Sequence, residues 1–530
     1  MSFKPMILHQ FGSVYNLIIR PDSTQFLEKE LGEIVQKNVQ VDIPALIKQI
    51  AKEYAKNNEH SSFVELDKLK TVYHNLPYMK KEAPVSGKDD STIDEADPYK
   101  YFHVINAFDM PNWKIEKETR AFIRNTNPPK ILGSPKESVH VERFDLIYQR
   151  LVRRPRSWKR ATSFKRVESK LPTIKDLRGR TGQSFTVFGM LTSLADGTYY
   201  LEDKDGCMKL DLSECEFEGF HAEGNFVLIK GQYCDGQTFK VLKMENPPLE
   251  CAEDTRKELG RIDFLGAPII FEDEVIKKCE VKWDHLFFAV LSDVWLDEYK
   301  TLANLREMFR IYASVNIFPF AFIFLGNFLS EPFLYTEEHS TKYKVAFDKL
   351  GSLIAEFPSI AKSSYFIFVP GSDDFILSGP LPQRHISDLY TSRIKYCSQE
   401  LVIFREDIIY KFKRNCIKVP KCQNTQDSLE KQVVRTLLHQ SHLCPFLLSA
   451  RPIVRDYDHS LRLYPVPDVL ILADKYPNYS FDIVTTSHPD NQNTDSTNIN
   501  KCHCLNPSGF SSNGYKWMVY YPASKKSELW

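Results

Sequence analysis

The sequence predicts a multidomain α+β protein, and three changes of pattern along its 530 residues support that prediction. Apolar residues recur at helical spacing in the first part, short alternating strands fill the middle, and near-continuous apolar runs alternate with helical patterns in the last part. At about 150 residues per domain, roughly three domains are expected. We predict an N-terminal helical domain over 1–77, a flexible tether over 78–98, an ordered connector over 99–183, a β-barrel over 184–250 and an α/β domain over 283–530.

The composition is that of a globular chain without a charge bias. Lys plus Arg and Asp plus Glu both number 69, so the formal net charge is zero. Proteins that bind nucleic acid through its phosphates usually carry a basic excess, so any such contact is expected to be local. No apolar run approaches the ~20 residues that span a bilayer, and no secretory signal opens the chain. Eleven cysteines scattered without CxxC pairs favour a reducing compartment, the cytosol or the nucleus.

Helical periodicity marks the N-terminal segment. Asp22 and Gln25 are spaced like a capping box before the first helix, and a third helix is predicted to begin at Ser62. The apolar positions of the first two helices are Leu27, Leu31, Ile34 and Val35, then Leu46, Ile47, Ile50, Ala51 and Tyr54. The stretch "KKEAPVSGKDDSTIDEADP" (80–98) that follows is polar and charged, which predicts a flexible tether.

A basic stretch lies within the connector. "RLVRRPRSWKRATSFKR" (150–166) holds eight Arg or Lys residues with Trp158 and Phe164 between them. Basic residues interleaved with aromatics are typical of single-strand binding. They are equally typical of a solvated connector or a nuclear-import signal, and we favour this second interpretation.

Five short strands in the segment 184–250 fit an OB-type barrel. Asp205-Gly206 and Asp235-Gly236 are hairpin signals between them. Barrels of this type often bind single strands through exposed aromatics. Here the second strand offers Tyr199 and Tyr200, but the third, "CMKLDLS", offers none. Three neighbouring carboxylates would repel a phosphate backbone, namely Glu202, Asp203 and Asp205. The barrel is therefore predicted to be a packing module.

The last part of the chain contains four apolar runs typical of sheet strands covered on both faces. "LFFAVL", "FAFIFL", "YFIFVP" and "DVLILA" are each followed by a small and a polar residue. These pairs are Ser292-Asp293, Gly326-Asn327, Gly371-Ser372 and Ala473-Asp474. In open α/β sheets the functional site lies at such carboxyl ends.

Two of these strand ends resemble motifs of the calcineurin-like phosphoesterases. "FFAVLSDVWLD" (287–297) resembles a D-x-H motif and "VPGSDD" (369–374) a G-N-H-D motif. Such an enzyme holds two metal ions with several carboxylate and imidazole ligands. Here Trp295 replaces the first histidine, Asn327 replaces the bridging aspartate, and "ADKY" (473–476) stands for G-H-x-H. The degenerate positions are Asp293, Trp295, Asn327, Ser372, Asp373, His442, Asp474 and Tyr476.

The resemblance therefore implies an α/β phosphoesterase domain that lacks its metal ligands. We expect no enzyme activity, no metal and no cofactor. Asp293 is expected to cap a strand end, and Trp295 to be buried in the space of the lost ions. His442 occupies the place of the lone histidine, but it and His439 are expected to be packed or capping residues.

One other cluster of metal-ligating residue types is present. Cys502, His503 and Cys504 are adjacent in the sequence. Adjacent ligands rarely share one tetrahedral ion, and no second pair follows at zinc-finger spacing. Free thiols are the favoured interpretation.

Longer stretches narrow the resemblance. "YCSQELVIFREDIIYKFKRNC" (396–416), "LRLYPVPDVLILADKY" (461–476), "INAFDMPNW" (105–113) and "CLNPSGF" (504–510) resemble the B-subunit family of DNA polymerase epsilon. This resemblance implies a noncatalytic subunit in the nucleus, in a complex with small histone-fold subunits. It implies that the barrel and phosphoesterase-like domains bind the C-terminal domain of the catalytic subunit, and that the helical domain binds GINS of the replicative helicase.

Two alternatives remain. The chain would be an active binuclear metallophosphoesterase if the strand ends kept their ligands. It would be a single-stranded DNA-binding OB protein if the barrel aromatics and the basic stretch shared a face. The polar loop over 485–501 is assigned no role, and no membrane contact is expected.

Overall fold

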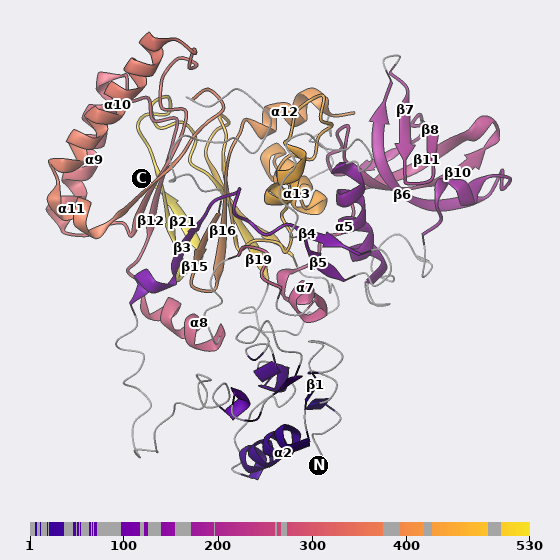
Figure 1. The fold of residues 1–530 in the computed structure, drawn as a ribbon. Coiled ribbons are helices and arrows are strands. Elements are labelled where there is room, and N and C mark those ends of the chain that lie inside the picture. The colour runs from indigo at the N-terminus through magenta and orange to yellow at the C-terminus, as the bar shows by residue number, and fades with distance from the viewer. Residues whose placement is uncertain are drawn as a thin grey trace. The chain divides into compact units, whose positions relative to one another are not determined.

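The computed structural model forms two compact units, Met1–Asp94 and Glu95–Trp530 (Figure 1). The described residues are 97–116, 121–125, 139–153, 171–194, 197–259, 262–266, 273–374, 393–417, 427–485 and 500–530, with part of 6–70. Most of the predicted tether, the basic residues after Arg153 and most of the polar loop lie outside the described residues.

In the first unit, helix α2 (Pro21–Gln36) follows the predicted periodicity, with Leu27 and Leu31 fully buried. The predicted start of a third helix at Ser62 is wrong. Phe63–Val64 forms strand β2, which pairs in parallel with β1 (Ile18–Ile19). The β-branched Val64 is fully buried in that pairing, and helical conformation is described only from Leu66 onward. The helical domain as a whole stays a prediction.

The middle of the chain forms a six-stranded sheet with the order β10-β6-β7-β8-β11-β9. Its strands are β6 (Ser184–Ser193), β7 (Tyr199–Glu202), β8 (Cys207–Asp211), β9 (Glu216–Glu218), β10 (Phe226–Cys234) and β11 (Thr238–Glu245). Because β10 pairs with both β6 and β11, the strand pairings form a closed ring in the order β6, β7, β8, β11, β10. Both predicted hairpins are present, and Gly236 has the positive φ of 72° that its turn requires. The three-residue β9 was not predicted.

The last part of the chain builds two further sheets. The five-stranded sheet has the order β14-β13-β12-β20-β21, and the six-stranded sheet has the order β18-β19-β17-β16-β15-β3. The first contains β12 (Phe288–Ser292), β13 (Ala321–Leu325), β14 (Tyr365–Val369), β20 (Met518–Tyr521) and β21 (Lys526–Leu529). The second contains β3 (Phe102–Ile105), β15 (Arg393–Tyr396), β16 (Gln399–Arg405), β17 (Val469–Ala473), β18 (Tyr479–Val484) and β19 (Lys501–Asn506).

Side chains from both sheets meet between them. Phe288 of β12 packs edge-on against Tyr396 of β15 at 5.5 Å, and the Tyr520 hydroxyl of β20 donates to Gln399 of β16. Figure 1 shows α9, α10 and α11 beside the five-stranded sheet, and α12 and α13 on the other side of the pair. These helices are α9 (Tyr299–Val315), α10 (Glu337–Ala355), α11 (Pro358–Ser363), α12 (Ile408–Asn415) and α13 (Leu429–Gln440). Helices therefore cover the outer faces, as the uninterrupted apolar strands predict.

The connector is more closely integrated than its sequence suggests. Strand β3 pairs antiparallel with β15 and completes an edge of the six-stranded sheet. Phe102 stacks on Tyr365 at 5.1 Å and lies edge-on to Phe320 at 5.1 Å. Two short strands, β4 (Trp113–Ile115) and β5 (Phe122–Arg124), follow as a hairpin.

Helix α5 (Val139–Arg153) joins the β6–β11 sheet to the α/β part. Ile147 and Leu151 pack in one apolar cluster with Phe188 and Phe226 of the sheet. On its other side, Arg150 donates to Ser441 Oγ and to the His439 carbonyl. Arg150 is therefore buried, although the sequence places it first in the basic stretch, and burial lowers its pKa to about 10. It is not on the surface to meet nucleic acid.

Neutral hydrogen bonds make a second connection between the same parts. Gln440, the last residue of α13, accepts from Phe226 N (2.7 Å) and donates to Phe226 O (2.8 Å). Asn225 donates to the Pro445 carbonyl at 2.7 Å. Gly224 (φ +85°) lies so close to this region that an added Cβ would be 2.6 Å from Leu447 N. These contacts thus hold the β6–β11 sheet in one position on the α/β part.

Candidate functional site

The predicted site residues of the five-stranded sheet meet where its parallel strands end. Asp293 follows β12, Asn327 follows β13, and Asp373 follows β14. Asn327 N donates to Asp293 Oδ1 at 2.8 Å. The Asn327 amide donates to Asp373 Oδ2 and accepts from Asp373 N, both at 3.0 Å. Ser372 bonds to Asp373 Oδ1 at 3.2 Å.

A residue not singled out in the sequence, Arg405, lies at the middle of this group. It is the last residue of β16, and its side chain is fully buried. Its guanidinium contacts Asp293 Oδ1 at 2.7 Å and Asp407 Oδ1 at 3.0 Å. It also donates to the carbonyls of Gly326 (2.5 Å) and Ala473 (3.1 Å). Burial opposes its charge, but the two carboxylates outweigh burial and raise the pKa of Arg405, so the guanidinium is charged.

A second unpredicted residue, Asp374, is the last letter of "VPGSDD". Its carboxylate accepts from Phe328 N at 2.6 Å and from Gly371 N at 2.7 Å. Burial raises the pKa of Asp374 to about 7. Gly326 leaves the space for this carboxylate, because an added Cβ would lie 1.9 Å from Asp374 Oδ2. We call Asp293, Asn327, Asp373, Asp374, Arg405 and Asp407 the strand-end centre.

Asp474 and Tyr476 serve local structure beside this centre. Asp474 accepts from Ile409 N and from Tyr476 N, both at 2.9 Å, and so caps the start of α12. Burial raises the pKa of Asp474 to about 6. Tyr476 is half-buried and packs against Tyr410.

His442 belongs to a different group of residues. Its ring accepts from Cys444 N at 3.0 Å, and its Nε2 lies 3.3 Å from Asp458 Oδ1. Asp458 in turn holds Arg143 of α5 at 2.6 Å. Burial lowers the pKa of His442 to about 4, so the ring is neutral near pH 7. His439, similarly, bonds to the Pro247 carbonyl at 2.5 Å.

Trp295 is half-buried rather than fully buried, and its place in the space of the lost ions stays a prediction. Val294 and Leu296 on either side are fully buried. The backbone N of Trp295 donates to Ser511 Oγ at 2.9 Å. The cationic group at the strand ends is Arg405.

Several carboxylate oxygens of the strand-end centre already accept hydrogen bonds from within the chain. Asp293 Oδ1 already accepts from Asn327 N and Arg405, and both Asp374 oxygens accept backbone N–H groups. Lys475 lies 3.5 Å from Asp373 and 3.6 Å from Asp407 and adds a second positive charge. Within the described ranges, no three His, Cys, Asp or Glu side chains are grouped so as to hold a metal ion.

The adjacent Cys502, His503 and Cys504 do not face one point. They lie on β19, where successive side chains alternate between faces. The two sulfur atoms are 3.8 Å apart and buried. His503 instead bonds to Asp482 (2.8 Å) and Ser527 (2.9 Å). The shared zinc site is therefore not formed, in line with the favoured free-thiol interpretation.

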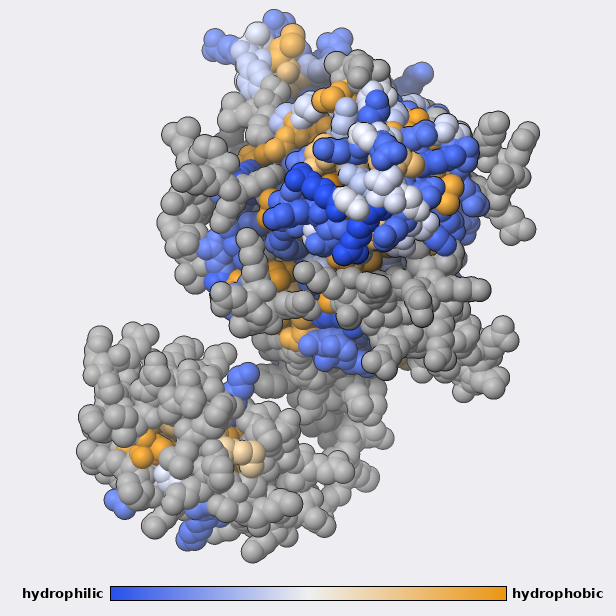
Figure 2. Space-filling model, turned by 90° about the vertical axis from the view of Figure 1, so that its right-hand side faces the viewer, coloured by the Kyte–Doolittle hydropathy of each residue, from blue (hydrophilic) through white to orange (hydrophobic). Residues whose placement is uncertain are grey.

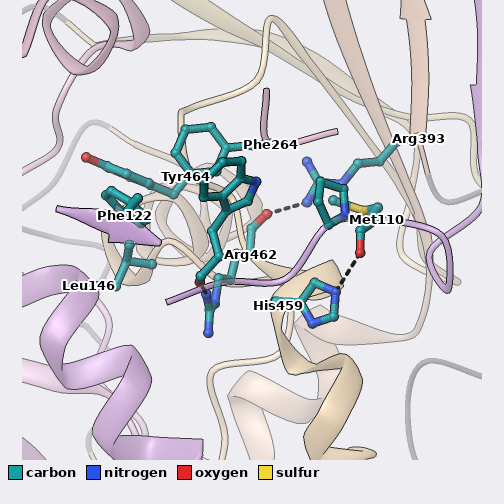
Figure 3. A pocket seen from close by; sticks show the side chains of 10 residues that line it. Met110, Phe122, Leu146, Phe264, Arg393, His459, Arg462 and Tyr464 are labelled. Atoms are coloured by element: carbon teal, nitrogen blue, oxygen red, sulfur yellow. Dashed lines mark hydrogen bonds between the residues drawn. The ribbon is translucent and has the colours of Figure 1, made fainter. Parts of the chain in front are cut away.

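A small pocket lies beneath the β4–β5 hairpin (Figure 3). Its aromatic lining residues are Trp113, Phe122, Phe264 and Tyr464. Figure 3 shows His459 bonded to the Met110 carbonyl and Arg393 bonded to the Arg462 carbonyl. The free space is about 20 Å³, enough for about one water molecule and too small for a base. Met110 and Trp113 of the connector are bonded here to His459 and Arg462 of the α/β part.

Comparisons with known proteins match this combination of sheets. The family model for the B subunits of DNA polymerases alpha and epsilon matches residues 288–481. The model "DNA polymerase epsilon subunit 2-like, OB-fold domain" matches residues 134–248, which include α5 and the β6–β11 sheet. The sheet is therefore an OB-fold domain.

Full-length relatives agree. The chain is 31% identical to DNA polymerase epsilon subunit 2 of Homo sapiens, over 97% of this chain and 95% of the human protein. It is 30% identical to the DNA polymerase epsilon B subunit of Arabidopsis thaliana over 80% of this chain and 82% of that protein. For the corresponding B subunit of Schizosaccharomyces pombe, the identity is 27% over 99% of this chain and 95% of that protein.

The fold and the matched models define an accessory subunit of a replicative DNA polymerase. Within that class, the chain belongs to the family of DNA polymerase epsilon B subunits. None of the described helices combines the length and apolar character needed to cross a bilayer.

Proposed function

We propose that this chain is a noncatalytic scaffold of DNA polymerase epsilon in the nucleus, built on an inactivated calcineurin-like phosphoesterase domain. The observation that supports the proposal is the position of the Arg405 side chain. A side-chain cation, bonded to Asp293 and Asp407, fills the strand ends where a phosphoesterase would hold metal ions. The native chain is expected to lack phosphate-ester hydrolysis with Mn²⁺. Hydrolysis that is lost on Asp293→Ala would contradict the proposal and favour the metallophosphoesterase alternative.

The scaffold surface is proposed to be the OB-fold and phosphoesterase-like domains together, which bind the C-terminal domain of the catalytic subunit. The support is their rigid joint, in which Gln440 pairs with both backbone atoms of Phe226. A pull-down with that isolated C-terminal domain tests the proposal. Gly224→Ala, whose Cβ would press on Leu447 N, should weaken capture. Gly351→Ala is the matched control, because an added Cβ there meets nothing within 4 Å.

The first unit is proposed to bind GINS of the replicative helicase, while small histone-fold subunits belong to the same assembly. The support is that Met1–Asp94 forms a compact unit of its own. Deleting 1–77 should abolish binding to GINS and leave binding to the catalytic subunit intact. If this deletion also released the catalytic subunit, the two-ended arrangement would be contradicted.

Single-stranded DNA binding is the remaining alternative for the OB-fold domain. Tyr199 and Tyr200 are half-buried, and Tyr199 packs against the core of the domain. The face that carries this domain is largely hydrophilic, with scattered apolar spots (Figure 2). A DNA contact is therefore proposed to be weak. Salt-sensitive binding of a single strand that Tyr200→Ala removes would favour the alternative.

A further inference from the structure

His503 of the stretch "KCHCL" (501–505) makes contacts that the proposed scaffold function does not use. Its side chain lies on the opposite face of β19 from the two cysteines beside it, which pack in an apolar cluster. Its Nδ1 lies 2.8 Å from Asp482 Oδ1, and its Nε2 lies 2.9 Å from Ser527 Oγ. A carboxylate, an imidazole and a serine hydroxyl joined in this order form the arrangement that serine hydrolases use for acyl transfer.

The three residues come from three strands that the fold brings together. Asp482 of β18 and His503 of β19 are direct cross-strand partners at one end of the six-stranded sheet. Ser527 lies on β21, at one end of the five-stranded sheet. The arrangement therefore depends on the folded chain, and it lies where these ends of the two sheets meet.

Each hydrogen bond of the group has a defined direction. An ionised carboxylate only accepts, so the neutral ring carries its proton on Nδ1 and donates to Asp482. The other ring nitrogen, Nε2, then accepts from the Ser527 hydroxyl. Ser480 Oγ is 2.7 Å from Ser527 Oγ but 3.5 Å from Nε2, so Ser527 is the hydroxyl partner of the imidazole. The ring of His503 is thus placed to act as a general base toward Ser527.

Contacts on several sides fix this base. The His503 side chain is 7% exposed, and its ring stacks on the buried Tyr520 with 5.7 Å between the ring centroids. Asp482 is fixed in turn, because its second carboxylate oxygen lies 3.4 Å from Lys501 Nζ. A base that is already oriented toward its serine needs little reorganisation to take the proton.

The nucleophile, in contrast, is accessible at a sheet edge. Ser527 is half-buried, and β21 ends its sheet among the described strands. Trp517 and Trp530 exchange two backbone hydrogen bonds, of 2.8 and 3.1 Å. Because bonded and non-bonded pairs alternate along antiparallel strands, the N–H of Ser527 points away from β20. A backbone N–H beside the nucleophile is the type of donor that stabilises the oxyanion of acyl transfer.

We propose that Asp482, His503 and Ser527 form an acyl-transfer triad, and that Ser527 is a site of covalent modification by activated esters. Ser527 Oγ attacks the carbonyl carbon of the ester while its proton passes to His503 Nε2. The new Oγ–C bond forms, the C–O bond to the leaving alcohol breaks, and that alcohol takes the proton from His503. The products are an ester of Ser527 and a free alcohol. Asp482 is a positioning residue, since it acts by orienting the ring.

The test is covalent labelling of the full chain with two reagents. A fluorophosphonate probe transfers its phosphonyl group to activated serines with release of fluoride, and p-nitrophenyl acetate transfers its acetyl group with release of nitrophenol. Mass spectrometry of the digested chain should place both groups on Ser527. His503→Gln should slow the labelling about 100-fold or more, because a general base contributes about 10²–10⁴-fold. Labelling that is as fast in His503→Gln, or in the chain unfolded in urea, would overturn the inference.

A second serine on the same part of the chain provides the matched control. Ser524 is exposed on the turn before β21, and its hydroxyl bonds to the Tyr521 carbonyl rather than to an imidazole. Ser524→Ala should leave the labelling unchanged, whereas Ser527→Ala should abolish it. Equal labelling of the two serines in the native chain would contradict the proposal, because exposure alone would then explain the reaction.

If His503→Gln fails to fold, Asp482→Ala replaces it, since the Asp482 side chain is 40% exposed. Asp482→Ala should slow the labelling, and Asp482→Glu, which keeps the carboxylate, should label faster than Asp482→Ala. Equal rates in the native chain and Asp482→Ala would overturn the triad, and equal rates in the two variants would overturn the positioning role. The inference is independent of the proposed function, because neither the strand-end centre nor the joint with the OB-fold domain contributes a residue to the triad.

Discussion

The strand-end centre and the junction around α5 use the same device, a buried arginine on a buried aspartate, for different tasks. The Arg405–Asp293 pair is 2.7 Å long and joins two sheets of one α/β part. The Arg143–Asp458 pair is 2.6 Å long and joins the connector helix to that part. The first lies at strand ends whose sequence resembles the motifs of metal-dependent phosphoesterases. In the second, no motif of the family resemblance is involved.

The two regions also respond to pH in opposite directions. At the strand ends, burial raises the pKa of Asp374 to about 7, so folding favours the protonated carboxyl. Around the junction, burial lowers the pKa of His140, His221 and His442 to about 4, so folding favours the neutral rings. Lowering the pH should therefore reduce the contribution of the junction to the free energy of unfolding and increase that of the strand-end centre. The two buried Arg–Asp pairs thus differ in the pH dependence of the titratable groups around them.

The largest expected effect is at the junction. Arg143→Ala should lower the free energy of unfolding by roughly 3–5 kcal/mol, because Asp458 would stay buried without the guanidinium that donates twice to its Oδ1. Urea unfolding measures this change. The exposed Arg306→Ala is the control and should leave the midpoint nearly unchanged. Equal effects of the two variants would show that burial does not decide the strength of these pairs.

Gly326→Ala tests how tightly the strand-end centre is packed, without changing its charge. Its added Cβ would lie 1.9 Å from Asp374 Oδ2 and 2.4 Å from Gly371 N, so the loops must move apart. We expect a loss of about 3 kcal/mol in the free energy of unfolding. Gly351→Ala, with open space around its Cβ, serves as the control in the same melting experiment. An unchanged midpoint in Gly326→Ala would mean that the centre is loosely packed.

Gln440→Ala tests the neutral connection beside the junction. It removes both bonds to Phe226, and leaving the buried Phe226 N and O unpaired should cost about 2 kcal/mol. Limited proteolysis should then cut between the OB-fold domain and the α/β part earlier than in the native chain. Unaltered cleavage would show that α5 alone fixes the joint.

His221→Gln tests the difference in pH response. The unfolded chain takes up a proton on His221 as the pH falls below about 6.5, but the folded chain does so only near pH 4. Stability is therefore present above pH 6.5 and is lost as the pH falls toward 4, by up to about 1.4 kcal/mol per pH unit for one group. The variant should flatten this slope in urea unfolding at pH 7.5, 6 and 5. Asp374→Asn should instead flatten the loss of stability as the pH rises through 7.

Sequence patterns predicted the parts of this molecule that depend on local periodicity and turn chemistry. The strands that end at Ser292 and Leu325, and the hairpins at Gly206 and Gly236, follow from alternation, apolar runs and Asp-Gly pairs. The edge strand β3 and the three-residue β9 were missed. Both are too short to show a period, and both are fixed by partners distant in the sequence.

From the sequence, the strand-end centre could be predicted only as a set of degenerate motif positions. The motif "VPGSDD" and Asn327 mark some of these positions, but nothing local marks Arg405, which lies at their middle. Its partners Asp293 and Gly326 lie 112 and 79 positions away along the chain. One signal was available, since a charged residue that ends the apolar run "LVIF" (401–404) of a covered strand must find a buried partner.

Trp295→Ala gives the smallest expected effect and sharpens the comparison most directly. If the indole filled the space of lost ions, its removal would cost roughly 3–5 kcal/mol, as for a fully buried aromatic. Because Trp295 is half-buried and Arg405 occupies the strand ends, we expect only about 1–2 kcal/mol, in proportion to the apolar area it covers. Phe324→Ala, at a fully buried strand position, is the control and should reach the larger range. Equal losses in the two variants would show that the indole, and not the guanidinium, fills the space at the strand ends. A small loss together with weaker capture of the catalytic subunit would instead mark the exposed part of Trp295 as part of the scaffold surface.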